Sequence, residues 1–172
     1  MKVSAKRLNT VEEYYFSTKL KEVNSLIKKG NPIINLGIGS PDLLPPSCAI
    51  EALKNSLNDQ YANNYQSYIG LEDLRISISK FYNKWFDVDL DFNSEILPLM
   101  GSKEGIMHIS MAFLNIGDSV LIPNPGYPTY SSVTNLVQAS PIYYDLKAEN
   151  NWFPSIQELE KNDLTKVKLM WL

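Results

Sequence analysis

The stretch GDSVLIPNPGYPTY, residues 117–130, joins a short apolar run to an unusually stiff turn. The run at 119–123 predicts a buried strand, because it is apolar, partly β-branched and bounded by turn residues. Pro125 and Pro128 then fix backbone torsions and remove amide donors on both sides of Tyr127. A ring held this way loses little entropy when a flat ligand stacks on it, although this stretch alone favours the alternative, an aromatic plug that closes the top of the core. The stretch leaves both roles open for Tyr127.

Short apolar segments and helical patterns alternate around this stretch. Strands are predicted at 95–100, 119–123, 141–146 and 166–172, and helices at 103–115, 129–138 and 155–162. In the last helix, Ser155 and Glu158 fit a capping box. Alternation of this kind is typical of a mainly parallel sheet flanked by helices, so the predicted fold class is α/β.

The first part of the chain carries helical patterns and one extended arm. Thr10 and Glu13 fit a capping box, which predicts an N-terminal helix that Gly30 ends. The stretch at 32–46, PIINLGIGSPDLLPP, is too rich in Gly and Pro to be regular throughout. Further elements are predicted along the chain: a helix after Pro46, a polar loop at 61–70, and a helix at 71–85 whose apolar stripe contains one polar residue, Arg75.

The amino-acid composition limits the classes of protein to which the chain can belong. The chain has 172 residues, a formal net charge of −3 and 44% hydrophobic residues, which is typical of a globular protein. A single cysteine, Cys48, and a single histidine, His108, exclude a disulfide framework and a zinc cluster, and neither residue receives a catalytic role. Scattered lysines argue against nucleic acid, and no apolar run approaches the roughly 20 residues that span a membrane. We therefore expect a cytoplasmic protein without a bound metal.

The stretch MGSKEG, residues 100–105, is a candidate phosphate site. It follows a predicted strand and opens a helix, so unpaired first-turn amides and the helix dipole attract an anion beside Gly101 and Lys103. The structural alternative is that Gly101 makes the turn and Ser102 caps the helix. Neither this stretch nor GIGSPD at 37–42 fits a Walker loop or a dinucleotide fingerprint. A nucleophilic role for Lys103 is less favoured than neutralising a bound phosphate.

Four segments occur in one order along the chain: INLGIGSPD at 34–42, YQSYIGLEDLR at 65–75, GSKEGI at 101–106 and GDSVLIPNPGYPTY at 117–130. Together they resemble the fold-type I, class I/II pyridoxal-phosphate-dependent aminotransferases over residues 10–172. The resemblance implies an incomplete large domain of that fold with an N-terminal helical arm. It divides the chain into an arm and part of a small domain, 1–45, and the N-terminal portion of the cofactor-binding large domain, 46–172.

The resemblance implies how pyridoxal 5'-phosphate is bound. Gly101, Ser102 and Lys103 match the loop and helix start that bind the cofactor phosphate within the subunit. Lys103 stands where the family often has serine or threonine, and a lysine suits a phosphate. Tyr127 matches the aromatic residue that stacks on the pyridine ring.

Two further residues are implied by the resemblance. Gly39 matches the glycine whose backbone lies beside the α-carboxylate of the substrate. Tyr65 matches a tyrosine that reaches across a homodimer interface to the cofactor phosphate of the other subunit. The implied activity moves an amino group between an amino acid and a 2-oxo acid.

Other residues of the family's site come later in its sequence than the part matched here. They include the Schiff-base lysine, the aspartate beside the pyridine nitrogen and the arginine for the substrate carboxylate. The resemblance thus implies the N-terminal part of an aminotransferase, inactive by itself because the Schiff-base lysine is absent. Two alternatives stay open: a non-catalytic, truncated or degenerate fragment that acts only by pairing with another chain, and an unrelated α/β protein that binds a nucleotide phosphate.

Overall fold

The computed structural model describes residues 4–11 and 13–172. These residues form two compact units. One comprises the described residues up to Glu13 together with Leu99–Leu172, and the other comprises Tyr14–Pro98. The division at residues 45 and 46 refers to the domains of the family and stays a prediction.

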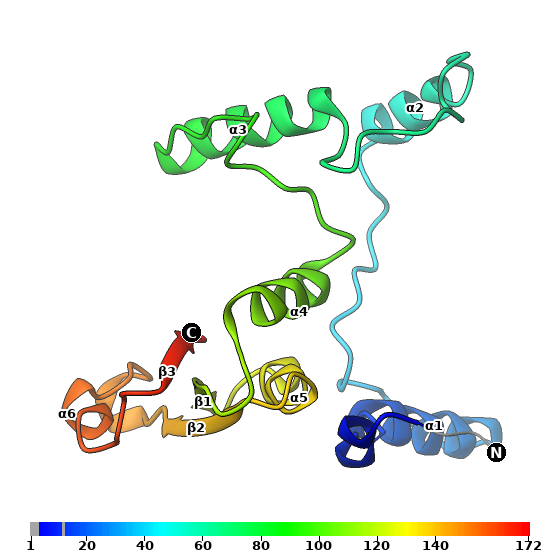
Figure 1. The fold of residues 1–172 in the computed structure, drawn as a ribbon. Coiled ribbons are helices and arrows are strands. Elements are labelled where there is room, and N and C mark those ends of the chain that lie inside the picture. The colour runs from blue at the N-terminus through cyan, green and yellow to red at the C-terminus, as the bar shows by residue number, and fades with distance from the viewer. Residues whose placement is uncertain (1–3, 12) are drawn as a thin grey trace. The chain divides into compact units, whose positions relative to one another are not determined.

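A three-stranded parallel sheet lies at the centre of the first unit (Figure 1). Strand β1 (Ser119–Asn124) lies between β2 (Ser140–Asp145) and β3 (Val167–Met170), and it pairs in parallel with both. The chain passes through α5 (Pro128–Leu136) between β1 and β2, and through α6 (Ile156–Leu159) between β2 and β3. Parallel strands need such crossovers. The predicted α/β class, a parallel sheet flanked by helices, is confirmed.

β1 is the central strand of this sheet, and its residues from Ser119 to Pro123 are all buried. Since successive side chains of a strand point to opposite faces, β1 contributes to two apolar clusters. One cluster contains Leu114, Val120, Ile122 and Ala139, and the other contains Leu121, Tyr144 and Leu159. A strand covered on both faces has a continuous apolar sequence, which explains why 119–123 could be predicted.

The predicted helices of this unit are present with adjusted ends. Helix α4 spans Ser102–Phe113 and α5 spans Pro128–Leu136. At α6, Ser155 Oγ accepts a hydrogen bond from the amide of Glu158 at 3.3 Å, which is one half of the predicted capping box. The helix ends sooner than predicted, at Leu159, and the Asn162 side chain donates to the carbonyl groups of Glu158 and Leu159 in its last turn.

The strand predicted at 95–100 is wrong. Residues 96–99 are extended but pair with no strand within 4–11 and 13–172. Pro98 has no N–H for a ladder, and it instead packs closely on Gly70, where an added Cβ would lie 2.9 Å from the proline Cγ. An apolar run becomes a strand only when a neighbour can pair with it, and the sequence does not show that neighbour.

The first helix also differs from its prediction. Residues Lys6–Thr10 form a separate 3-10 helix, η1, which packs against α5. Val11 is extended, and α1 (Tyr15–Lys28) begins five residues after Thr10 rather than at it. The contact of η1 with α5 therefore outweighs the local capping signal. Gly30 follows the end of α1 with φ +85°, in agreement with its predicted role.

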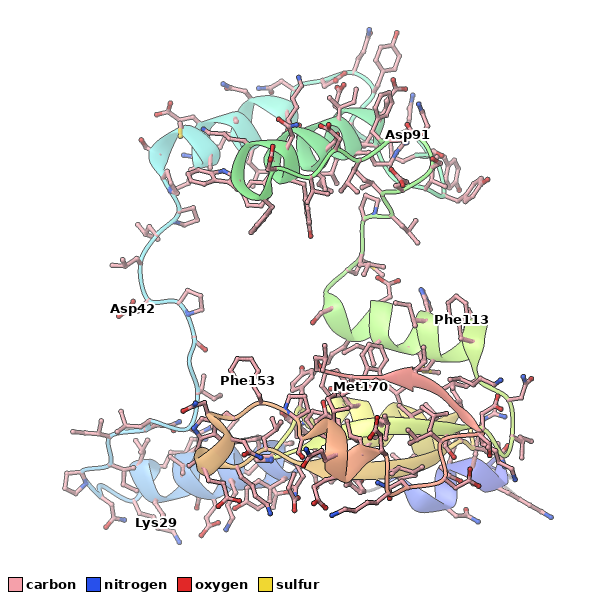
Figure 2. The ribbon with its side chains drawn as sticks, turned by 90° about the vertical axis from the view of Figure 1, so that its left-hand side faces the viewer. Lys29, Asp42, Asp91, Phe113, Phe153 and Met170 are labelled. Carbon is pink, nitrogen blue, oxygen red and sulfur yellow. The ribbon has the colours of Figure 1, made fainter. Side chains whose placement is uncertain are left out.

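An extended stretch links α1 to α2 (Ser47–Ser56), and Asp42 lies on it (Figure 2). It contains no helix or strand, as its Gly and Pro content predicted. The polar loop at 61–70 is likewise free of both.

Helix α3 (Glu72–Phe86) agrees with the predicted helix at 71–85 to within one residue at each end, but its burial is unexpected. Arg75, the polar member of the stripe, is 5% exposed, whereas Phe81 and Trp85 are 52% and 63% exposed. The Arg75 guanidinium donates to the carbonyl oxygen of Phe92 and lies 6.0 Å from the Phe92 ring. It thereby fixes the turn that follows the helix.

Asp91 lies in this turn (Figure 2). Its carboxylate accepts hydrogen bonds from Ser94 Oγ at 2.6 Å and from the Asn93 amide at 3.0 Å. These bonds, that of Ser94 first, hold the pKa of Asp91 below its ordinary value, although desolvation opposes them.

We expect the turn to lose order as the pH falls below about 4, near the pKa of an unfolded aspartate. A carboxyl group whose pKa is lowered by folding contributes stability that is fully present above the unfolded value and is lost as the pH falls through the folded value. An NMR titration of the Asn93 and Ser94 amides should show this transition. Asp91→Asn should remove it and Asp87→Asn should leave it; a transition that persists in Asp91→Asn would contradict the assignment.

Candidate phosphate and ring-stacking site

The N-terminus of α4 is built around Gly101. This residue is the N-cap and has φ +100°, a conformation that side chains rarely allow. Ser102 is the first helical residue, so the alternative in which Ser102 caps the helix is wrong; within the described chain, no side chain caps α4. Glu104 accepts a hydrogen bond from the Met100 amide at 2.6 Å, which ties the preceding loop to the first turn. A helix start of this kind suits an anion.

Tyr127 lies in the turn between β1 and α5. It is the N-cap of α5, and Pro128 is the first helical residue. The turn is tight, because a Cβ added at Gly126 would lie 2.2 Å from the carbonyl oxygen of Pro123. Tyr127 is 37% exposed, at the carboxyl end of a central parallel strand, where open α/β sheets bind their ligands.

The structure brings Lys103 and Tyr127 together. Lys103 Nζ lies 5.7 Å from the centroid of the Tyr127 ring, within the range of a cation–π contact. A hydrogen bond with Thr129, and then the hydrogen bond and positive charge of Lys103, lower the pKa of the Tyr127 phenol, while desolvation opposes them. The start of α4 and the Tyr127 ring therefore suit one ligand that carries both an anionic group and a flat ring, as pyridoxal 5'-phosphate does.

Gly39 and Tyr65 belong to the other unit, and their predicted roles stay predictions. Gly39 lies in a groove of about 590 Å³ whose other lining residues come from the start of α1 and from its own segment: Tyr14, Phe16, Ser17, Leu20, Gly37, Ile38 and Ser40. The Tyr65 side chain is fully exposed in its loop. Each is accessible, so neither role is obstructed within that unit.

Two residues that support the Tyr127 ring were not predicted from the sequence. Tyr130 contacts the Tyr127 ring edge to face, and Trp171 stacks on Tyr130. The spacing of Tyr127 and Tyr130, three residues apart at a helix start, was the available signal, since such residues are neighbours on one helix face. Trp171 had no such signal, because only the fold brings this residue, directly after β3, beside Tyr130 of α5.

Two further candidate residues, Cys48 and His108, lie at the surface of the described chain. Cys48 is a free, exposed thiol, and His108 is exposed on α4. Within the described ranges, no group of three His, Cys, Asp or Glu residues is placed to hold a metal ion. None of the described helices has the length and apolar character needed to cross a bilayer.

The fold and these residues define an α/β protein with a candidate site for a phosphorylated ring compound beside its central strand. The family model for aminotransferase class I and II matches residues 31–172, and the chain belongs to this family. Membership removes the alternative of an unrelated protein that binds a nucleotide phosphate.

Similar proteins agree with this assignment. The chain is 37% identical over 166 residues to LL-diaminopimelate aminotransferase of Aquifex aeolicus (strain VF5), covering 96% of this chain and 43% of that protein. It is 38% identical over 169 residues to LL-diaminopimelate aminotransferase of Natranaerobius thermophilus, covering 98% and 44%.

Solved structures match nearly all of this chain and less than half of their own length. BacF from Bacillus subtilis, in its apo form, matches with a TM-score of 0.92 and 31% identity, covering 100% of this chain and 44% of that one. Alanine aminotransferase from Pyrococcus furiosus matches with a TM-score of 0.86 and 28% identity, covering 98% and 43%. The chain therefore spans less than half the length of the relatives that it matches.

Proposed function

We propose that the chain is part of a pyridoxal-phosphate-dependent aminotransferase that moves an amino group between an amino acid and a 2-oxo acid. The observation that carries the proposal is the approach of Lys103 to the Tyr127 ring beside the start of α4, in a chain of this family. Pyridoxal 5'-phosphate, when bound, supplies the electron sink for this chemistry, and the protein supplies position and charge.

The residues of the first unit would hold the cofactor by two kinds of contact. Amides at Gly101 and Ser102 and the Lys103 ammonium would bind the phosphate, because together they offer donors, a helix dipole and a full positive charge. The Tyr127 ring would stack on the pyridine, and its stiff turn limits the entropy lost on binding. Tyr127 is 37% exposed, so part of its side chain is accessible to a ligand.

The second unit would contribute to substrate and partner contacts. Gly39 has no atom within 4 Å of the place where a Cβ would be, so a substrate carboxylate can approach its backbone. Tyr65 would reach the cofactor phosphate of the other subunit in a homodimer. We also keep a cytoplasmic location as part of the proposal.

We propose further that the 172-residue chain binds the cofactor but does not by itself catalyse transfer of the amino group. In the family, the lysine that carries the cofactor comes later in the sequence than the part that this chain matches. The rival proposal is a non-catalytic fragment that acts only by pairing with another chain.

The first test separates binding from turnover. Titration calorimetry with pyridoxamine 5'-phosphate should show saturable binding, and an assay of 2-oxo acid release from an amino acid with pyridoxal 5'-phosphate should show no turnover above free cofactor. Inorganic phosphate should compete with the first ligand. Absence of saturable binding would contradict the proposed cofactor site, and sustained release of 2-oxo acid would contradict the proposed inactivity.

A further inference from the structure

Three aromatic rings form a continuous series at the carboxyl end of the sheet. The Tyr127 and Tyr130 rings meet edge to face, with centroids 5.7 Å apart and planes at 84°. The Tyr130 and Trp171 rings are parallel, with centroids 5.0 Å apart and planes at 1°. Both geometries are favoured arrangements of aromatic pairs.

Trp171 is fixed by the sheet. Its amide donates to the carbonyl oxygen of Leu121 in β1 at 2.9 Å, and its own carbonyl oxygen accepts a hydrogen bond from the Tyr144 hydroxyl of β2. The indole packs against the buried cluster that contains Val120 and Ile122. The hydrogen bonds to β1 and β2 fix the Trp171 backbone directly after β3, and the packing against the cluster restricts its ring.

Tyr130 is fixed as well. Its carbonyl oxygen accepts a hydrogen bond at 2.7 Å from Thr134 Oγ1, a side chain with no exposed surface. Its hydroxyl donates to the carbonyl oxygen of Leu172 at 3.4 Å. Tyr127, in contrast, precedes the helix with extended torsions, φ −70° and ψ +123°, so the regular geometry of α5 does not set its ring.

We propose that Tyr130 is a positioning residue, which transfers the fixed position of Trp171 to the Tyr127 ring and so sets the plane on which a pyridine ring stacks. The inference rests on the proposed function, because it assigns Tyr130 to the same cofactor site. It goes further, because neither the family match nor the motifs give Tyr130 a role. Tyr130 acts through Tyr127 and need not touch the cofactor.

The inference predicts that replacing Tyr130 weakens binding of a ligand with a ring more than binding of phosphate alone. Tyr130→Leu keeps apolar bulk but removes the edge-to-face contact. The free energy of such a contact corresponds to a change of about threefold to tenfold in affinity. Binding of pyridoxamine 5'-phosphate should weaken by this factor, whereas binding of inorganic phosphate should stay within about twofold of the wild type. The ratio of the two dissociation constants is therefore the measured quantity. Pyridoxamine 5'-phosphate is preferred because it has no aldehyde that could react with surface lysines.

Two variants serve as controls. Tyr130→Phe keeps the ring and removes only the hydroxyl, so its ratio should equal that of the wild type. Tyr143→Leu makes the same substitution at a tyrosine of β2 that is 55% exposed, and it should also leave the ratio unchanged. A Tyr130→Leu ratio equal to the wild-type ratio, or equal weakening of both ligands, would overturn the inference.

A second measurement needs no ligand. A 3-fluorotyrosine introduced at position 127 gives a fluorine NMR signal that reports the surroundings of this ring. Tyr130→Leu should shift or broaden the signal, and Tyr143→Leu should not; an unchanged signal in Tyr130→Leu overturns the inference. If the signal responds but wild-type protein binds pyridoxamine 5'-phosphate no more tightly than phosphate, the proposed function fails while the positioning of Tyr127 by Tyr130 stands.

Discussion

Lys103→Gln is expected to weaken binding of pyridoxamine 5'-phosphate by about tenfold to a hundredfold. A hydrogen bond to a charged group is worth about 1.5–3 kcal/mol, and glutamine keeps a donor but loses the charge. The Tyr127 ring would remain for stacking, so binding should be reduced rather than abolished. Titration calorimetry at constant ionic strength measures the effect, since salt weakens contacts of this kind.

Lys147→Gln is the matched control for this prediction. Lys147 belongs to the same unit, and its ammonium lies 3.8 Å from Glu149, with an exposed side chain. Its replacement should leave binding within about twofold of the wild type. Equal affinities of the Lys103→Gln variant and the wild type would show that Lys103 is not a phosphate ligand.

The Lys103→Gln variant can also be tested without a ligand. The hydrogen bond and charge of Lys103 contribute to the lowered pKa of the Tyr127 phenol, after the larger contribution of Thr129. Lys103→Gln should therefore raise this pKa, which tyrosinate absorbance in a pH titration can detect by difference from Tyr127→Phe. An unaltered titration curve would contradict the contact between Lys103 and Tyr127.

Ile122→Ala is expected to lower the free energy of unfolding by about 2–5 kcal/mol, the usual cost of emptying a buried isoleucine site. Ile122 is 2% exposed in the central strand and packs in the cluster beneath α5. Denaturation by urea, followed by circular dichroism, measures the change. Because β1 leads into the Tyr127 turn, the loss should also weaken cofactor binding.

Ile116→Ala provides the comparison. The substitution is chemically identical, but Ile116 is 76% exposed after the end of α4, so its effect should stay within about 0.5 kcal/mol. Similar losses in the two variants would mean that the cluster around β1 contributes less than its burial indicates.

The sequence was informative where one pattern sufficed to specify an element. The continuous apolar run at 119–123 predicted β1, because a strand covered on both faces needs no alternation. Helices α3, α4 and α5 followed from apolar spacing and from Gly and Pro at their ends. These signals are local, and so are the structures that they specify.

Predictions failed where a distant contact decided the outcome. The extended run near Pro98 has no pairing partner in the described chain, and η1 packs on α5 instead of continuing into α1. Arg75 is buried because Phe92 returns to it across a turn, which no periodicity could reveal. For the site, the sequence supplied Lys103 and Tyr127 separately, and their approach became visible only in the fold.

The series of rings from Tyr127 to Trp171 has an optical consequence. Rings with centroids 5.7 Å and 5.0 Å apart are close enough to exchange excitation energy, so we expect Trp171 to receive energy absorbed by Tyr127 or Tyr130. A chromophore stacked on Tyr127 would intercept that energy. The indole of Trp171, directly after β3, is thus an intrinsic fluorescent probe, placed by the fold itself, for whatever occupies the surface of the Tyr127 ring.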